Sequence, residues 1–317
     1  MTVLFTLKVS EKDEQRLTED YPMLEFIFCS NMDEAEKYIE QAEVIVTYGN
    51  DLDNTLIERA TRLKWVSVLS AGLDDLPFQA LEKKGVIVTN VRGIHKVPMA
   101  EYAISMLLQV YRYEKTLMKM QQQQGWGRSS VKPLEISGKT MLIAGTGAIG
   151  QEVARLAKAF NMKTIGVSRS GQAKDYFDVN VKTPDMVSRL YEADFIVSVL
   201  PSTQETKYLF KMEHFKAMKD EAVFLNMGRG DVVKSDVILE ALQSKEIMHA
   251  VLDVFEEEPL PKEHPLWQAD NITITPHLSG ISPQYLPRAL EIFEKNLNVY
   301  TEKGNAYINK IDMARGY

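Results

Sequence analysis

Three polar side chains with complementary chemistry follow short apolar runs in the second half of the chain. Arg229 lies in NMGRG (226–230), Glu258 in DVFEEEPL (253–260) and His277 in TPHLSG (275–280). A guanidinium can hold a carboxylate and polarise a carbonyl, and an imidazole, whose ordinary pKa is near neutrality, can deliver a proton to oxygen. A carboxylate beside the imidazole fixes the ring. Hydride transfer to a 2-oxo acid needs these three parts.

Each of the three residues also has a simpler interpretation. An arginine after a strand is usually part of a surface ion pair, and a glutamate in a run of three is usually solvated. The remaining histidines have no comparable setting, and we assign no chemistry to them: His95, His214, His249 and His264. The chemistry therefore depends on what the rest of the chain can bind and position.

A glycine pattern predicts where a dinucleotide binds. Gly145-x-Gly147-x-x-Gly150 follows the apolar run 141–144, and helical spacing continues to residue 160 before a second strand at 164–167. In this setting Gly145 permits a tight turn, Gly147 lets the backbone approach a pyrophosphate, and Gly150 lets the helix pack close. Free N–H groups at the helix start face the anion. The predicted cofactor loop is Gly145, Thr146, Gly147, Ala148, Ile149 and Gly150.

The end of the second strand indicates which dinucleotide is preferred. Enzymes that prefer NAD carry an acidic residue there for the ribose 2′-hydroxyl, whereas this chain has Ser168, Arg169 and Ser170. An arginine flanked by hydroxyls can hold a 2′-phosphate. We predict that these residues bind the cofactor and prefer NADP(H), with NAD(H) possible. The alternative is that Arg169 is merely exposed and Asp175 or another group serves NAD.

The remaining pattern predicts an α/β fold with two doubly wound parallel sheets. Short β-rich runs occur at 3–9, 24–29, 44–48, 65–69 and 86–89, with helical spacing at 33–41 and 52–59. A long helix is expected over 98–120, and a final one over 283–299. Around the glycine loop we expect strands at 195–200, 222–226, 248–253 and 272–275, and helices at 183–191, 214–218 and 235–243.

The length of 317 residues favours two domains. We predict a flavodoxin-like substrate domain from 1–99 plus 281–317, and a Rossmann cofactor domain from 100–280. Small residues leave the fourth strand at Ser70, Ala71 and Gly72, where backbone N–H groups could face a carboxylate. A plain turn is an equally good interpretation of that segment.

Composition excludes several classes of function. The net charge of −7 argues against a nucleic-acid surface, and no apolar run approaches membrane-spanning length. We find no signal peptide and expect a cytoplasmic protein with no membrane partner. The single cysteine, Cys29, lies in an apolar run and is expected to be a core thiol. No spacing of His, Cys or carboxylates predicts a metal site.

A tryptophan stands between two glycines in the loop that follows the predicted long helix. Trp126 in GWG suggests either a contact with another subunit or a buried anchor for the loop itself.

In their order along nearly the whole chain, seven motifs resemble the D-2-hydroxyacid dehydrogenase family, which includes glyoxylate/hydroxypyruvate reductases. They are SAGLDDLP from Ser70, PMAEYAISMLL from Pro98, the glycine loop, LPSTQET from Leu200, NMGRGDVV from Asn226, DVFEEEPLP from Asp253 and TPHLSG from Thr275. The resemblance implies that Arg229 binds the substrate carboxylate and carbonyl. It implies that His277 is the acid/base and that Glu258 pairs with it.

Further roles rest on the same resemblance. Ala71 and Gly72 would offer N–H groups to the carboxylate, and Asp253 would meet the nicotinamide side of the cofactor. Pro201 and Thr206 would line its adenosine and ribose side. The remaining cofactor contacts expected from the motifs are Leu200, Met227, Gly228, Arg229, His277 and Gly280, and Ser70 is expected beside the substrate. The resemblance also implies a homodimer formed through the cofactor domain, using the helix after Pro98 and the loop carrying Trp126.

The leading functional prediction is NAD(P)H-dependent reduction of glyoxylate, hydroxypyruvate or a similar 2-oxo acid, or the reverse reaction. One alternative is a dinucleotide-sensing module like the corepressors related to this family. Against that alternative, the chain has no long basic or disordered extension. Another is a dehydrogenase of larger, branched 2-hydroxy acids, with an apolar pocket drawn from Leu69, Leu73, Met99, Leu278 and Tyr285.

Overall fold

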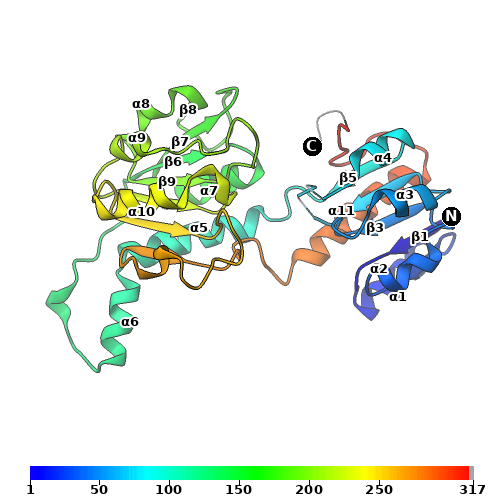
Figure 1. Ribbon diagram of the computed structural model, residues 1–317, viewed down its shortest axis with the longest axis horizontal. Helices are drawn as coiled ribbons and strands as arrows, with labels where there is room; N and C mark the ends of the chain where they lie inside the picture. Colours follow the sequence, from blue (N-terminus) through cyan, green and yellow to red (C-terminus); the bar gives the residue numbers. More distant parts are fainter. Residues whose placement is uncertain (71, 74, 314–317) are drawn as a thin grey trace. The chain divides into compact units, whose positions relative to one another are not determined.

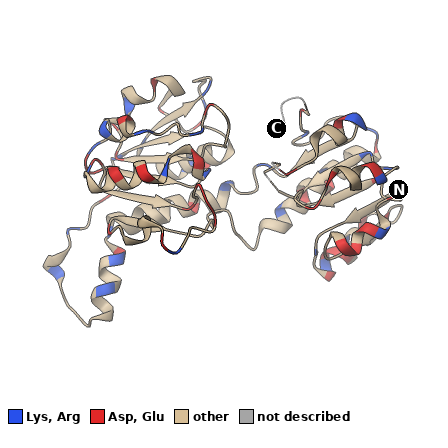
Figure 2. Ribbon diagram, in the orientation of Figure 1, with Lys and Arg blue, Asp and Glu red and all other residues tan. Residues whose placement is uncertain are grey.

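The chain folds into two compact units, each built around one parallel sheet. The computed structural model describes residues 1–70, 72–73 and 75–313. One unit comprises Met1–Ile94 and the chain from Ser282 onward, and the other comprises His95–Ile281 (Figure 1). Acidic and basic residues occur along the chain of both units (Figure 2). The prediction of two doubly wound α/β sheets is confirmed.

The smaller unit holds a five-stranded sheet with the order β2-β1-β3-β4-β5, and all its pairs are parallel. Its strands are β1 (Thr2–Phe5), β2 (Glu25–Phe28), β3 (Val44–Thr47), β4 (Trp65–Val68) and β5 (Ile87–Asn90). Its helices are α1 (Glu11–Asp20), α2 (Met32–Ala35), α3 (Asn54–Arg59), α4 (Phe78–Lys83) and α11 (Tyr285–Thr301), with a 3₁₀ turn at Glu36–Tyr38. This strand order is the flavodoxin-like one.

The larger unit holds a seven-stranded sheet with the order β12-β11-β10-β9-β6-β7-β8. Its strands are β6 (Thr140–Ala144), β7 (Lys163–Ser168), β8 (Val179–Lys182), β9 (Phe195–Ser198), β10 (Val223–Asn226), β11 (His249–Leu252) and β12 (Ile272–Ile274). Its helices are α5 (Lys96–Tyr111), α6 (Glu114–Gln122), α7 (Ala148–Ala159), α8 (Val187–Leu190), α9 (Met212–Lys216) and α10 (Ser235–Gln243). Short 3₁₀ turns lie at Arg128–Ser130, Thr183–Asp185, Gly230–Val232 and Pro265–Gln268.

The strand order of the larger sheet reverses between β6 and β9. In doubly wound sheets the ligand crevice lies outside the carboxyl ends of the strands at this point. The glycine loop follows β6, and Leu200 and Pro201 follow β9, so both segments leave the sheet at the reversal. The topology therefore carries the predicted cofactor segments to one edge of the sheet.

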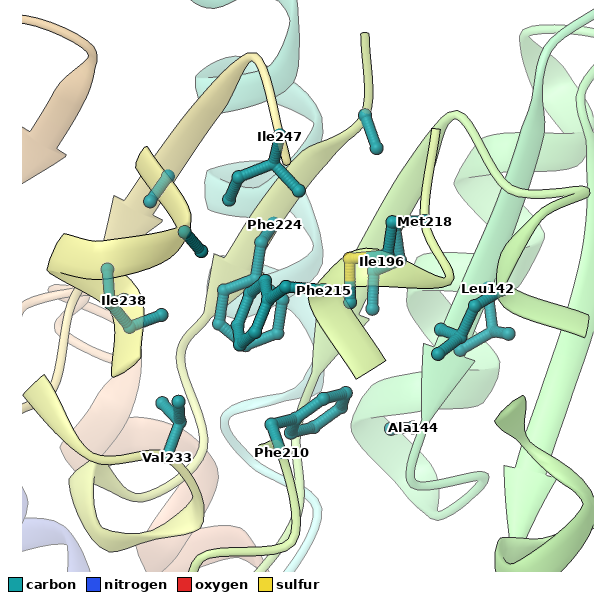
Figure 3. Close-up of a cluster of buried hydrophobic side chains, with 14 of the residues drawn as sticks. Leu142, Ala144, Ile196, Phe210, Phe215, Met218, Phe224, Val233, Ile238 and Ile247 are labelled. Carbon is teal, nitrogen blue, oxygen red and sulfur yellow. The ribbon is translucent and has the colours of Figure 1, made fainter. Parts of the chain in front are cut away.

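Side chains that alternate along β10 build a core on each face of this sheet, because successive residues of a strand point to opposite faces. Phe224 packs on one face against Phe210 and Phe215, at ring-centroid distances of 5.1 and 5.3 Å and near-perpendicular planes (Figure 3). Val223 and Leu225 pack on the other face, where α5 and α7 supply the covering side chains. Burial of both faces holds the strand ends rigidly in place.

The predicted long helix over 98–120 is wrong in one respect. The structure has α5 and α6 as separate helices, because Tyr113 between them adopts a left-handed φ of 57°. The helices predicted at 33–41 and 183–191 are also broken, into one α-helical turn and one 3₁₀ turn each. Sequence patterns missed α1, α4 and the edge strand β8 altogether.

Cys29 is a core thiol, as predicted. It is buried among the apolar residues of the smaller unit, and burial raises the pKa of its thiol. None of the helices in the described ranges combines the length and the apolar character needed to cross a bilayer.

Candidate active site

Arg229 lies in the turn after β10, and hydrogen bonds made by the side chain of the last residue of β10 hold this turn closed. Asn226, the last residue of β10, is fully buried, and its side-chain amide donates to the Arg229 carbonyl at 3.0 Å. The Asn226 Oδ1 atom accepts a hydrogen bond from Gly228 N at 3.3 Å. Among the described residues, no carboxylate lies within ion-pair distance of the Arg229 guanidinium, which donates to the Gly228 carbonyl at 3.0 Å. The simpler interpretation of Arg229 as a surface ion pair is therefore wrong.

Two glycines bring the neighbouring loops against this turn. A Cβ on Gly230 would lie 1.9 Å from the backbone carbon and oxygen of Phe255. A Cβ on Gly228 would lie 2.5 Å from the Leu200 carbonyl oxygen. Distances this short exclude any side chain. The loop carrying Arg229 therefore contacts both the loop that leads to Glu258 and the predicted cofactor segment after β9.

Glu258 and His277 form a pair. His277 Nδ1 lies 2.7 Å from Glu258 Oε2, and the other carboxylate oxygen accepts a hydrogen bond from Phe255 N at 2.9 Å. A carboxylate only accepts, so Nδ1 carries the hydrogen and Nε2 is the ring nitrogen left to exchange a proton with a substrate. The His277 side chain is 53% exposed and that of Glu258 is 34% exposed, so the imidazole is open to a ligand. Glu258 is thus paired rather than merely solvated.

Asp253 anchors the segment that carries His277. Its fully buried carboxylate accepts hydrogen bonds from Thr275 Oγ1 at 2.6 Å, Leu278 N at 2.9 Å and Ser279 N at 2.9 Å. His277 itself has a left-handed φ of 51° and donates its N–H to the Asp253 carbonyl at 2.9 Å. The cofactor role that the family resemblance implies for Asp253 stays a prediction. Its role in holding this segment was missed.

The glycine loop has the conformation expected of a phosphate cradle. Gly145 has a φ of +106°, which favours glycine. A Cβ on Gly150 would lie 1.9 Å from the Gly145 carbonyl oxygen, so the first turn of α7 packs directly against the glycine turn. A Cβ on Gly147, the residue that precedes α7, would meet nothing within 4 Å. The backbone there faces open space beside the helix N-terminus, where unpaired N–H groups and the helix dipole favour an anion. These residues fit a dinucleotide pyrophosphate.

The other predicted cofactor residues lie along the same edge of the sheet. After β9, Thr206 Oγ1 donates to the Pro201 carbonyl at 2.6 Å and accepts from Thr203 N at 2.9 Å, which closes that loop. After β7, Ser168 Oγ accepts a hydrogen bond from Gly171 N at 3.1 Å. Leu200 and Met227 are buried, and Arg169 is exposed. Contact of each with a cofactor stays a prediction.

The predicted substrate residues near the end of β4 belong to the other compact unit. Ser70 Oγ donates to the Gly72 carbonyl at 3.1 Å, and Ala71 lies outside the described residues. The carboxylate role of this segment stays a prediction. The suggested apolar pocket loses three members, because Leu69 and Leu73 belong to buried cores of the smaller unit and Met99 to the buried core that α5 builds with α7.

Three of the four remaining histidines have structural positions, consistent with assigning them no chemistry. His214 and His264 accept hydrogen bonds at the starts of short helical turns. His249 bonds to the Thr273 hydroxyl, and its burial lowers its pKa to about 4.

His95, to which we assign no chemistry from the sequence, differs from these three histidines because it lies near the candidate active site. Its ring packs against Gly280, where a Cβ would lie 2.9 Å from His95 Cδ2. Burial and the nearby Arg229 charge both lower the pKa of His95. The His95 imidazole therefore lies beside the segment that follows His277. Its place directly before the helix that opens the larger unit was the one available signal.

Comparison with known proteins agrees with this arrangement. Residues 104–279 match the family model described as "D-isomer specific 2-hydroxyacid dehydrogenase, NAD binding domain". The chain is 31% identical over 267 residues to the glyoxylate reductase of Pyrococcus furiosus, covering 82% of this chain and 79% of that protein. It is 32% identical over 280 residues to the D-3-phosphoglycerate dehydrogenase of Methanocaldococcus jannaschii, covering 88% of this chain but only 53% of that longer protein.

Two solved structures share the fold over nearly their whole length. A D-isomer specific 2-hydroxyacid dehydrogenase family protein from Aeromonas salmonicida has a TM-score of 0.88 and 36% identity, covering 98% of this chain and 99% of that one. An NADPH-dependent glyoxylate/hydroxypyruvate reductase from Sinorhizobium meliloti, in complex with NADP and sulfate, has a TM-score of 0.81 and 26% identity, covering 100% and 99%. This chain therefore belongs to the D-isomer specific 2-hydroxyacid dehydrogenase family of nicotinamide-dinucleotide-dependent oxidoreductases.

Proposed function

We propose that this protein reduces a small 2-oxo acid of the glyoxylate or hydroxypyruvate type, or catalyses the reverse reaction, with NADP(H) as the preferred cofactor. The observation that carries the proposal is the pair formed by His277 Nδ1 and Glu258 at 2.7 Å, next to a turn that presents Arg229 without a carboxylate partner among the described residues. The names of similar proteins, glyoxylate reductase among them, point the same way.

In this proposal each side chain has one role in the reaction. The reduced nicotinamide, when bound, supplies the hydride that the substrate carbonyl carbon accepts. Arg229 binds the substrate carboxylate and stabilises the charge that grows on the carbonyl oxygen. His277 donates the proton on Nε2 to that oxygen, and Glu258 holds the ring and stabilises its charged form. In the reverse direction His277 Nε2 accepts the proton from the hydroxyl.

The experiment that tests the substrate class is a panel of initial rates. Glyoxylate, hydroxypyruvate, pyruvate and branched 2-oxo acids are each offered with NADPH and with NADH. We expect the highest kcat/KM for glyoxylate or hydroxypyruvate. A higher kcat/KM for branched acids would favour the alternative of a larger-substrate dehydrogenase. D-3-phosphoglycerate with the oxidised cofactors completes the panel, and activity on it alone would favour the chemistry named for the Methanocaldococcus jannaschii relative.

Preference for NADP(H) rests on the segment after β7. Replacing Arg169 with alanine is expected to raise the KM for NADPH about tenfold and leave the KM for NADH nearly unchanged, because a charge-assisted bond to a 2′-phosphate exists only with NADPH. Steady-state kinetics with both cofactors measures the effect. Arg155→Ala is a matched control, since Arg155 is paired with Glu152 on α7. Equal changes in both KM values for Arg169→Ala would remove the 2′-phosphate argument.

We also propose that the chain forms a homodimer through the larger unit. No residue of α6 is buried, and Leu117, Met118 and Trp126 are exposed, Trp126 at 96%. The helix α6 and the loop after it extend away from the sheet of the larger unit (Figure 1). The alternative of Trp126 as a buried anchor is therefore wrong. On α5 and α7, a groove of about 510 Å³ is lined in part by Leu108, Leu156 and Phe160. The groove and the segment formed by α6 and the loop after it are both partly apolar and belong to the same chain. In this proposal a second copy of the chain covers both of them.

Light scattering on the purified protein is expected to give twice the 36.0 kDa chain mass. Leu108→Lys places a charge in the groove and should give the monomer mass at the same concentration. Val187→Lys, at an exposed apolar residue of α8, is the control and should stay dimeric. A monomeric native protein, or a dimeric Leu108→Lys variant, would contradict the proposed interface.

A further inference from the structure

Lys182, the last residue of β8, lies beside the end of β7, where the segment proposed to select the cofactor begins. β8 ends at Lys182, and the parallel register pairs Lys182 with Ser168 at the end of β7. Paired residues of neighbouring strands project their side chains to the same face of a sheet. Ser168 occupies the strand end where NAD-preferring enzymes carry the carboxylate that binds the ribose 2′-hydroxyl. Lys182 is therefore the nearest strand neighbour of that position.

The turn after β7 folds back onto the stem of Lys182. Gly171 adopts φ +65°, and a Cβ at this position would lie 2.9 Å from Lys182 Cγ and 3.1 Å from Lys182 N. The absence of a side chain at Gly171 permits this contact. The aliphatic part of Lys182 is thereby held against the turn that carries Ser168, Arg169 and Ser170, and the residue is exposed.

Lys182 and Arg169 are the two positive charges beside Ser168, and neither is neutralised by a carboxylate in the part of the chain that the structure describes. Neither Lys182 nor Arg169 takes part in an ion pair within 4.0 Å there, although the chain carries a net charge of −7. Both residues are exposed. Ser168 and Ser170 accept backbone N–H groups of Gly171 and Gln172, at 3.1 and 3.3 Å, so each hydroxyl keeps its own hydrogen to donate. Two cations and two hydroxyl donors match the charge and acceptor number of a phosphate monoester.

We infer that Lys182 is a second cation for the adenosine 2′-phosphate of NADP(H), acting with Arg169. This inference rests on the proposed preference for NADP(H) and adds to it a residue from a different strand. Arg169 supplies a planar guanidinium, and Lys182 supplies a point charge from the side of β8. A dianionic phosphate gains from both, whereas the 2′-hydroxyl of NAD(H) offers Lys182 no charge to neutralise.

The test measures binding rather than turnover. Titration calorimetry compares 2′,5′-ADP, which carries the 2′-phosphate, with 5′-AMP, which lacks it, on the full-length protein. Lys182→Gln is expected to weaken 2′,5′-ADP binding about fivefold to tenfold and leave 5′-AMP binding unchanged. Lys182→Arg keeps the charge and should retain most of the affinity. Lys163→Gln, at the opposite end of β7, should change neither ligand.

The outcomes separate this inference from the proposal on which it rests. If 2′,5′-ADP binds the native protein no more tightly than 5′-AMP, the preference for NADP(H) fails and the role of Lys182 fails with it. If the native protein prefers 2′,5′-ADP and Arg169→Ala removes that preference while Lys182→Gln does not, only the role of Lys182 is overturned. Thermal unfolding of each variant checks that the exposed substitutions leave the fold intact.

Discussion

Replacement of His277 with asparagine is expected to lower kcat for 2-oxo acid reduction by about 10³-fold, within the range that general acid catalysis contributes. Asparagine cannot supply an acidic proton, whereas His277 is held by Glu258 so that Nε2 can donate one. The KM for the cofactor should change little, because the glycine loop and the turn after β7 are untouched. Single-turnover and steady-state rates measure the effect.

The matched control is His264→Asn, which alters a histidine whose Nδ1 accepts a hydrogen bond from Leu266 N at the start of a 3₁₀ turn. This variant should keep nearly the native kcat. A His277→Asn variant that retains kcat within about tenfold of the native value would show that another group delivers the proton. His95 would then be the first residue to test, because its ring packs against Gly280, three residues after His277.

Replacement of Arg229 with lysine is expected to lower kcat/KM for the 2-oxo acid by about 10²- to 10³-fold, although the charge is kept. A lysine ammonium cannot make the two parallel bonds that a guanidinium makes with a carboxylate. Its donors all lie on one nitrogen and do not reproduce the planar fork that spans the carboxylate and the carbonyl oxygen. The Asn226 side chain holds the backbone carbonyl of residue 229, so the turn should survive the substitution.

Arg155→Lys provides the control for this prediction, since Arg155 lies on α7 in an ion pair with Glu152. It should leave kcat/KM for the 2-oxo acid nearly unchanged. If Arg229→Lys keeps native kcat/KM, the substrate carboxylate is held elsewhere. A loss confined to the KM for the cofactor would assign Arg229 to the dinucleotide rather than to the substrate.

The parts of the fold that sequence predicts well are those with regular apolar patterns. The predicted helix at 235–243 coincides with α10, and the predicted strands fall on strands of both sheets, most of them buried. Both sheets are covered on two faces, so their strands are short continuous apolar runs. The glycine spacing likewise predicts the turn, because only glycine fits the φ of residue 145 and the contact at residue 150.

The missed elements have weak patterns for identifiable reasons. α1 buries only Leu17, so it shows almost no apolar stripe, although Ser10 caps its first turn. β8 is an edge strand without a buried residue. The break between α5 and α6 depends on one left-handed residue, Tyr113, in a stretch whose residue types continue to favour a helix. Whether a helix breaks at such a residue depends on tertiary packing, which the local residue types do not show.

The sequence predicted which residues make up the candidate site, but it did not predict the contacts that hold them in position. The spacing of strands carried Arg229, Glu258 and His277 to the same edge of a sheet, and the pairing of the last two followed from resemblance. The supporting roles of Asn226 and Asp253 were missed, because a buried amide or carboxylate at a strand end has no distinctive local pattern. The Asp253 hydrogen bonds join segments 25 and 26 residues apart, whereas the Asn226 side chain bonds within its own turn, where the residue types alone do not show which groups pair.

The most direct test of the central claim is the rate of NADPH oxidation by the purified protein with glyoxylate or hydroxypyruvate as the only acceptor. We predict saturable consumption of NADPH with formation of the corresponding 2-hydroxy acid, at a higher kcat/KM than with NADH. Absence of consumption with either cofactor, at enzyme concentrations that bind the dinucleotide, would contradict the account.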